Sequence, residues 1–198
     1  MCRTIVPVLA IALGVLSLPV QSGAETIACT SLALDIRRTE SRPTQYQVFC
    51  EATPRACLMQ GPASIGLDPD RLQQVATVNR AVNNEIILRP DMECYGLEEI
   101  WTLHKAGGYG DCEDMALEKR QRLVEAGFPS AALTLAIVHH REQYFAHAVL
   151  LLESDHGTLV LDNLSDDIAC WDDAPYEFER REHPDGTWIR FVRPNVRH

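Results

Sequence analysis

The sequence predicts a mixed fold of helices and antiparallel strands. Apolar residues recur at helical spacing between residues 68 and 87 and again between residues 112 and 126. Short runs of β-forming residues, separated by turn residues, fill much of the C-terminal half. Strands joined by tight turns pair antiparallel. The 198 residues can form one domain with a proper core, but not two large ones.

The first 24 residues have the three-part form of a secretory signal. Arg3 precedes an apolar run from Ile5 to Leu18, and the small residues at positions 22 and 24 favour cleavage before Glu25. A membrane anchor is the competing interpretation, but the run is short for a membrane span. We therefore expect residues 1–24 to be a signal peptide and residues 25–198 to form a single domain that is periplasmic or secreted.

The charge of the chain limits its partners. The net charge is −10, and basic residues form no run longer than the pairs Arg37-Arg38 and Arg180-Arg181. Nucleic acids and anionic lipids both bind clustered positive charge. We therefore expect no nucleic-acid partner.

One helix is predicted in the N-terminal half. Prolines between residues 25 and 61 discourage long helices, so we expect an extended arm or a short strand there. Asp68 can cap a helix that continues to about Ile87. Asn79 and Asn83 lie four residues apart in this helix, and we interpret them as part of its polar face.

A loop follows at Arg89-Pro90-Asp91, and a short helix is predicted from Glu98 to Lys105. Trp101 lies within this helix, just ahead of the glycines that begin at Gly107. It can line a substrate cleft, or it can be a buried structural residue.

The stretch from Gly107 to Leu117 places Cys112 at the first turn of a helix that we expect to span Cys112 to Ala126. Unpaired amides and the helix dipole favour the thiolate there. The acids Asp111, Glu113 and Asp114 act in the opposite direction, because negative charge raises the pKa of a thiol. An imidazolium or a bound divalent cation can offset them. The competing interpretation is a core helix that begins with a buried cysteine, but such a helix needs neither the glycines nor the acids.

Two later segments supply a base and an acid. The run from Tyr144 to Glu153 contains His147, and the run from Gly157 to Leu164 contains Asp162. If the two strands pair antiparallel around the turn between them, His147 and Asp162 lie at nearby strand ends. The acid can then hold the imidazole against Cys112, which is the geometry of a catalytic triad.

Other strands complete the predicted sheet. A buried strand spans Leu133 to Val138, and a closing pair spans Tyr176 to Arg181 and Thr187 to Val192. We place His139 and His140 at the surface, with contact to a site residue or metal binding as alternative roles. The acids Asp166, Asp167, Asp172 and Asp173 indicate a solvated loop or an ion site.

Three motifs closely resemble the bacterial transglutaminase-like cysteine peptidases: Gly110-Asp111-Cys112-Glu113-Asp114, His147-Ala148-Val149-Leu150 and Leu161-Asp162-Asn163. The likeness spans roughly Val48 to Phe191. It implies a papain-like, transglutaminase-like α+β fold in which the helix bearing the nucleophile packs on an antiparallel sheet. It also implies that Cys112 is the nucleophile, His147 the base and Asp162 the residue that orients the base. Leu103 departs from the pattern, because family members normally carry a proline there.

The resemblance further implies calcium as a cofactor, bound by the acids that flank the cysteine, here Asp111 and Glu113. Some family members cleave large surface adhesins and are controlled by a membrane receptor. The sequence therefore predicts an exported cysteine endopeptidase that acts on proteins. Two alternatives remain: a transglutaminase or amidase that uses the same triad, and a non-enzymatic binding module in which Cys112 is oxidised or buried.

Seven cysteines are present, and Cys2 leaves with the signal peptide. Cys50 and Cys57 enclose a short loop that a disulfide can bridge, and the resemblance includes a cysteine pair in this region. The pairing of Cys29, Cys94 and Cys170 stays open at this stage. If Cys112 is free, at least one other cysteine lacks an intramolecular partner. A zinc site is disfavoured, because no paired Cys and His spacing is present.

Overall fold

The computed structural model describes residues 27–103 and 107–192, and its centre is a seven-stranded antiparallel sheet. In spatial order the strands are β1 (Ile36–Glu40), β9 (Trp188–Phe191), β8 (Tyr176–Glu182), β4 (Leu133–His140), β5 (Ala146–Ser154), β6 (Gly157–Leu161) and β7 (Ala169–Cys170). Two short strands, β2 (Ile87–Leu88) and β3 (Tyr109–Gly110), pair in parallel with each other. The predicted signal peptide lies outside the described residues.

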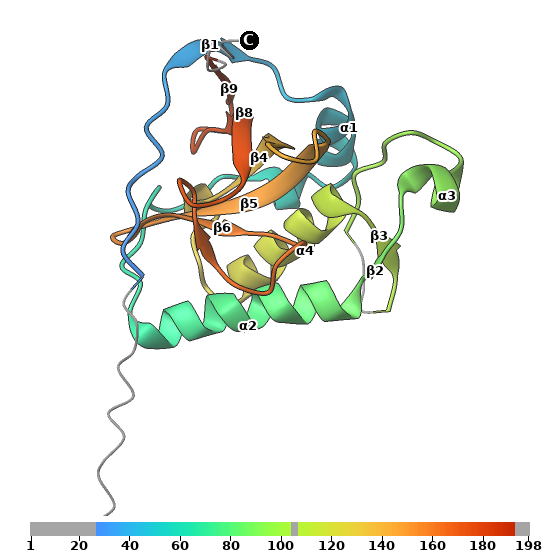
Figure 1. The fold of residues 1–198 in the computed structure, drawn as a ribbon. Coiled ribbons are helices and arrows are strands. Elements are labelled where there is room, and N and C mark those ends of the chain that lie inside the picture. The colour runs from blue at the N-terminus through green and yellow to red at the C-terminus, as the bar shows by residue number, and fades with distance from the viewer. Residues whose placement is uncertain (1–26, 104–106, 193–198) are drawn as a thin grey trace, which may run out of the picture.

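Among the described residues, four helices accompany the sheet: α1 (Thr44–Ala52), α2 (Pro69–Glu85), α3 (Asp91–Tyr95) and α4 (Cys112–Glu125). Single 3-10 turns occur at Pro54–Cys57 and Ser130–Ala132. Helix α4 packs against β5, and α2 packs against α4 (Figure 1). This arrangement confirms the α+β class. In the described part of the chain, no helix has the length and apolar character that crossing a membrane requires.

Both long helices form close to where their patterns predict them. Asp68 caps α2, since its side chain accepts a hydrogen bond from the Arg71 N–H at 2.8 Å. Helix α4 begins at Cys112 and ends at Glu125, and Gly127 follows with a φ of +90°, a conformation that glycine adopts without strain. Val124, near the end of α4, is an apolar residue that is 37% exposed.

The central strands are apolar on both faces because both faces are covered. On β5, Leu150 and Leu152 belong to the core beneath α4, whereas Val149 and Leu151 belong to a second core on the opposite face. The side chains of Leu32 and Leu34, in the N-terminal arm, cover part of that second core. The alternation follows the two-residue period of a strand.

The hairpin that carries the predicted base and acid has the expected pairing. Strands β5 and β6 are antiparallel, with Leu150 opposite Leu161 and Ser154 opposite Gly157. Asp162 follows β6 directly, so it lies near the start of β5, where His147 is located. Gly157 leaves the turn with a φ of +93°, and a side chain there would meet the Cys29 carbonyl oxygen at 2.5 Å.

Two disulfides join parts of the described chain. Cys50 bonds to Cys57, as the short loop between them suggested, and Cys29 bonds to Cys170 across 141 residues. Cys94 and Cys112 are free. The structure thus resolves the pairing that the sequence left open.

Two local predictions were wrong. The segment after Pro43 forms the helix α1, although an extended arm or short strand was expected. Residues 98–103 form no helix, and the rest of the expected Glu98–Lys105 helix lies outside the described residues. Asp91 accounts for part of this difference, because its side chain accepts a hydrogen bond from the Ile100 N–H and so holds this segment in a loop. The helical turn α3 begins at Asp91 instead.

A buried ion pair links α4 to the end of β8. Arg120 donates to the carboxylate of Glu182 at 2.7 Å, and both side chains are at most 3% exposed. Arg120 also donates to the Tyr46 hydroxyl, which itself donates to Glu182 at 2.7 Å. Every member of this network is therefore satisfied, a condition for a buried charge to be tolerated.

Replacing Glu182 with Gln should destabilise the protein by about 3–5 kcal/mol, because the Arg120 charge stays buried without its counter-charge. Urea unfolding of the wild type and the variant measures this difference. The control is Glu51→Gln, since Glu51 is exposed and contacts Gln47 on its own helix. That variant should change the free energy of unfolding by no more than about 0.5 kcal/mol. Equal losses in the two variants would contradict the prediction.

Candidate active site

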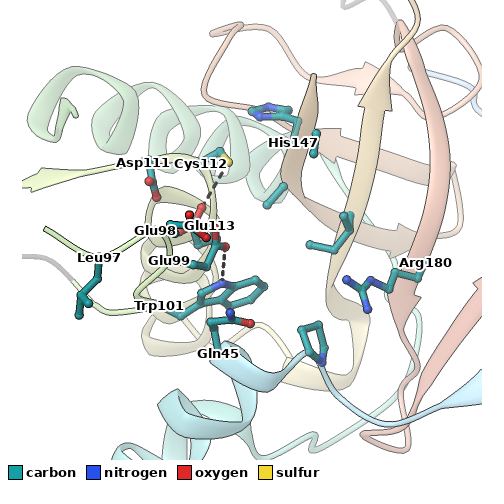
Figure 2. Close-up of a pocket in the computed structure, with 14 residues that line it drawn as sticks. Gln45, Leu97, Glu98, Glu99, Trp101, Asp111, Cys112, Glu113, His147 and Arg180 are labelled. Atoms are coloured by element: carbon teal, nitrogen blue, oxygen red, sulfur yellow. Dashed lines mark hydrogen bonds between the residues drawn. The ribbon is translucent and has the colours of Figure 1, made fainter. Parts of the chain in front are cut away.

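A cavity of about 760 Å³ brings together residues from α4, β5 and the segment before α4. Cys112 and Glu113 come from α4, and His147 comes from β5. Figure 2 shows Cys112 and His147 toward one end of this cavity, with Trp101 and Gln45 on another wall. Trp101 satisfies both interpretations of its role, since it lines the cavity and is only 6% exposed. The cavity is large enough for several residues of an extended peptide.

Cys112 is the first residue of α4, as the glycines and the helical pattern predicted. Asp111 precedes it in an extended conformation, and Gly110 pairs with Leu88 in the small parallel sheet. The Cys112 Sγ lies 3.3 Å from the Glu113 Oε2. The Ala148 N–H also points at the sulfur, which ties the start of α4 to β5.

His147 and Asp162 form a buried pair. The His147 Nε2 lies 2.8 Å from the Asp162 Oδ1, and the two side chains are 4% and 9% exposed. The Tyr176 hydroxyl donates to the Asp162 Oδ2, and the Leu164 N–H donates to the Oδ1 at 3.0 Å. Burial alone would raise the pKa of Asp162, but the His147 interaction and the other donors hold it below its usual value. Asp162 is thus an ionised, fixed acceptor for the imidazole.

The rings around His147 limit its orientation. Phe145 meets the imidazole edge to face at 5.8 Å, and Tyr176 lies 5.6 Å from it. With the Nε2 bonded to Asp162, the Nδ1 is the ring nitrogen that remains for another partner. The structure therefore brings two of the predicted site residues into direct contact and places the third on the same cavity.

The surroundings of the sulfur favour the thiol in the absence of a cation. Burial raises the pKa of Cys112 well above its ordinary value, and Glu113 and Asp111, when they are ionised, add to this effect. The Ala148 N–H opposes it. The acids therefore disfavour the thiolate, as the sequence indicated. A nearby positive charge must offset them if the thiolate is to form.

Three carboxylates gather beside the cysteine. Asp91, Asp111 and Glu113 each place an oxygen within 4.8 Å of the others. Burial, followed by the side-chain hydrogen bond with Asp111 and then the Asp111 charge, raises the pKa of Glu113 to about 10. The buried Asp111 Oδ1 and Glu113 Oε1 accept no hydrogen bond from the described residues. Such oxygen-rich sites suit a hard divalent cation, which lowers the repulsion between the acids.

Two other candidate sites have structural explanations. Asp172 and Asp173 cluster with Cys170, but the sulfur of Cys170 is already bonded to Cys29. His140 was expected at the surface, yet it is 8% exposed and stacks on Phe145. His139 is half-buried and pairs with Glu179.

Sequence reasoning missed several residues of the site. Asp91 was read only as part of a loop, since nothing in its spacing links it to Asp111 and Glu113. The role of the Tyr176 hydroxyl could not be predicted either, because its partner Asp162 comes close only when the sheet forms. Asn79 and Asn83 were assigned to a polar face, but Asn79 is fully buried and both amides bind the segment after β6.

Comparisons with known proteins agree with this geometry. The structure is similar to that of calcium-bound LapG from Legionella pneumophila, with a TM-score of 0.53 and 24% sequence identity over 67% of this chain and 75% of that one. EGTA-treated LapG from the same organism gives a TM-score of 0.52 at the same identity, over 65% and 72% of the two chains. These likenesses support the fold. A search of curated proteins finds no match.

A match to a family model shows which family the chain belongs to. The model of the bacterial transglutaminase-like cysteine proteinases matches residues 36–195, which includes every strand and helix described above. The cysteine at the start of α4 and the His147–Asp162 pair both lie within the matched range. The chain belongs to the bacterial transglutaminase-like cysteine proteinase family.

Proposed function

We propose that this chain is an exported cysteine endopeptidase in which Cys112, His147 and Asp162 act as a catalytic triad. The observation that carries the proposal is the buried His147–Asp162 hydrogen bond beside a cavity that Cys112 also lines. A nucleophile, a base and a group that orients the base are the parts that covalent hydrolysis requires.

The steps follow from these roles. The Cys112 Sγ attacks the carbonyl carbon of the scissile peptide bond, and His147 carries the proton to the leaving amine as the C–N bond breaks. Water then attacks the thioester, with His147 as base, and the sulfur is released. Amides in the first turn of α4 have no partner within the helix, so they can stabilise the oxyanion. Asp162 keeps the imidazole in the required tautomer throughout.

We further propose that Asp91, Asp111 and Glu113 hold a calcium ion. The support is the group of carboxylate oxygens within 4.8 Å, two of which accept no hydrogen bond from the described residues. The bound ion would supply positive charge beside the sulfur, which favours the thiolate. LapG has been described in a calcium-bound form, which is consistent with this assignment.

The family resemblance extends the proposal to partners and location. We expect a large surface adhesin among the protein substrates, a membrane receptor that limits access to them, and a periplasmic or secreted enzyme. The two disulfides fit an oxidising compartment.

Replacing Cys112 with Ala should abolish cleavage of exported host proteins, because no nucleophile remains. Cys94→Ala is the matched control, since Cys94 is the other free cysteine in the described chain, and it should cleave like the wild type. The measurement is the appearance of a discrete cut, seen by gel electrophoresis and mass spectrometry, after incubation with exported proteins of the same host. Full cleavage by Cys112→Ala would refute the triad.

Adding calcium should raise the temperature of thermal unfolding, because a ligand that binds only the folded state stabilises it. EGTA should reverse this shift and lower the rate of cleavage. Glu113→Gln should remove most of the calcium response, since it takes one carboxylate from the site. Asp173→Asn, in the acidic cluster around the disulfide-bonded Cys170, is the control and should respond like the wild type. An unchanged calcium shift in Glu113→Gln would argue against the site.

A further inference from the structure

Side chains of α2 hold the segment that follows β6. Asp162 begins this segment, and residues 163–166 continue it past α2. In Figure 1 the loop after β6 descends to α2, which runs beneath it. Two asparagines one helical turn apart make the contact, so they project from the same face of α2.

Both asparagines bind the backbone of this segment. The Asn83 Nδ2 lies 3.0 Å from the carbonyl oxygens of Asp162 and Ser165, and equally far from the Asp166 Oδ1. The Asn79 Nδ2 lies 3.1 Å from the carbonyl oxygens of Ser165 and Asp166. Asn79 is 0% exposed, so a missing bond there would leave polar groups buried without water.

A third group reaches the same segment from α4. Lys119 is 1% exposed, and burial lowers the pKa of its ammonium to about 7. The carboxylates of Asp162 and Asp166 oppose this decrease. Helices α2 and α4 therefore both supply polar groups that interact with the turn carrying Asp162.

We infer that Asn79 and Asn83 are positioning residues, which hold the turn after β6 so that Asp162 stays in register with His147. The inference rests on the proposed triad. Asn83 fixes the backbone carbonyl of Asp162, while His147, Tyr176 and the Leu164 N–H fix its carboxylate. A shift of the backbone would move the Oδ1 from its 2.8 Å contact with the imidazole. Asp162 keeps one orientation because both its backbone carbonyl and its carboxylate are held by hydrogen bonds.

The test uses Asn83→Ala and Asn79→Ala, with Asn84→Ala as the matched control. Asn84 lies on the same helix and is exposed, and its amide binds only the Arg80 carbonyl oxygen of that helix. Hydrolysis of p-nitrophenyl acetate gives kcat and KM, and Cys112→Ala gives the background rate. The hydrogen bond between His147 and Asp162 is followed by NMR of the imidazole nitrogens in each variant.

The expected result for Asn83→Ala is a kcat lower by roughly tenfold to a hundredfold with little change in KM, because the reacting groups are misaligned rather than absent. The NMR signals of the His147 ring nitrogens should change, since the hydrogen bond between Nε2 and the Asp162 carboxylate is less well formed. Asn84→Ala should behave like the wild type. A role confined to stability would lower the unfolding temperature and leave both kcat and the imidazole NMR signals of the folded protein unchanged.

The outcomes separate this inference from the proposed function. If Cys112→Ala hydrolyses the ester as fast as the wild type, the triad fails and the inference fails with it. If Cys112→Ala is inactive while Asn83→Ala retains the wild-type kcat and the wild-type imidazole NMR signals, only the inference is overturned. Should the fully buried Asn79 be needed for folding, Asn83→Ala decides the matter alone, because Asn83 is only partly buried.

Discussion

The placement of one carboxylate governs the rest of the site. Asp162 can orient His147 only if it remains ionised in a buried position, and burial opposes ionisation. Three donors resolve this conflict: the imidazole, the Tyr176 hydroxyl and the Leu164 N–H. They come from different parts of the sheet, so the position of the acid depends on the correct assembly of β5, β6 and β8. The sheet is in this sense the support of the His147–Asp162 pair.

The second constraint is electrostatic. A nucleophile among acids is unfavourable, since every nearby carboxylate raises the pKa of the thiol. The same acids are close enough to share a cation, and the Oδ1 of Asp111 and the Oε1 of Glu113 have no hydrogen-bond donor in the described chain. The cluster is therefore costly without a ligand and favourable with one. A cation bound by this carboxylate cluster would thus also affect the protonation state of Cys112.

Much of this arrangement could be predicted from local pattern. Each local feature can be recognised in a short stretch of the chain: the glycines before Cys112, the helical spacing after it, and the hairpin between His147 and Asp162. Contacts between residues that are distant in sequence could not be predicted in this way. Asp91 was read as a loop residue, and Asn79 and Asn83 as a polar face, because their partners are distant in sequence. The helix expected from Glu98 failed for a similar reason: the N–H groups of Ile100 and Thr102 donate to the side chains of Asp91 and Asp114.

The bond between Cys29 and Cys170 ties the N-terminal arm to the strand at one edge of the sheet. It closes a loop of 141 residues, and long loops lose the most chain entropy when they are cross-linked in the unfolded state. Where thiols are kept reduced, this bond does not form, and the arm is held by non-covalent contacts alone, which include its hydrogen bonds and the packing of Leu32 and Leu34. The folded protein is consequently less stable in a reducing compartment than in an oxidising one.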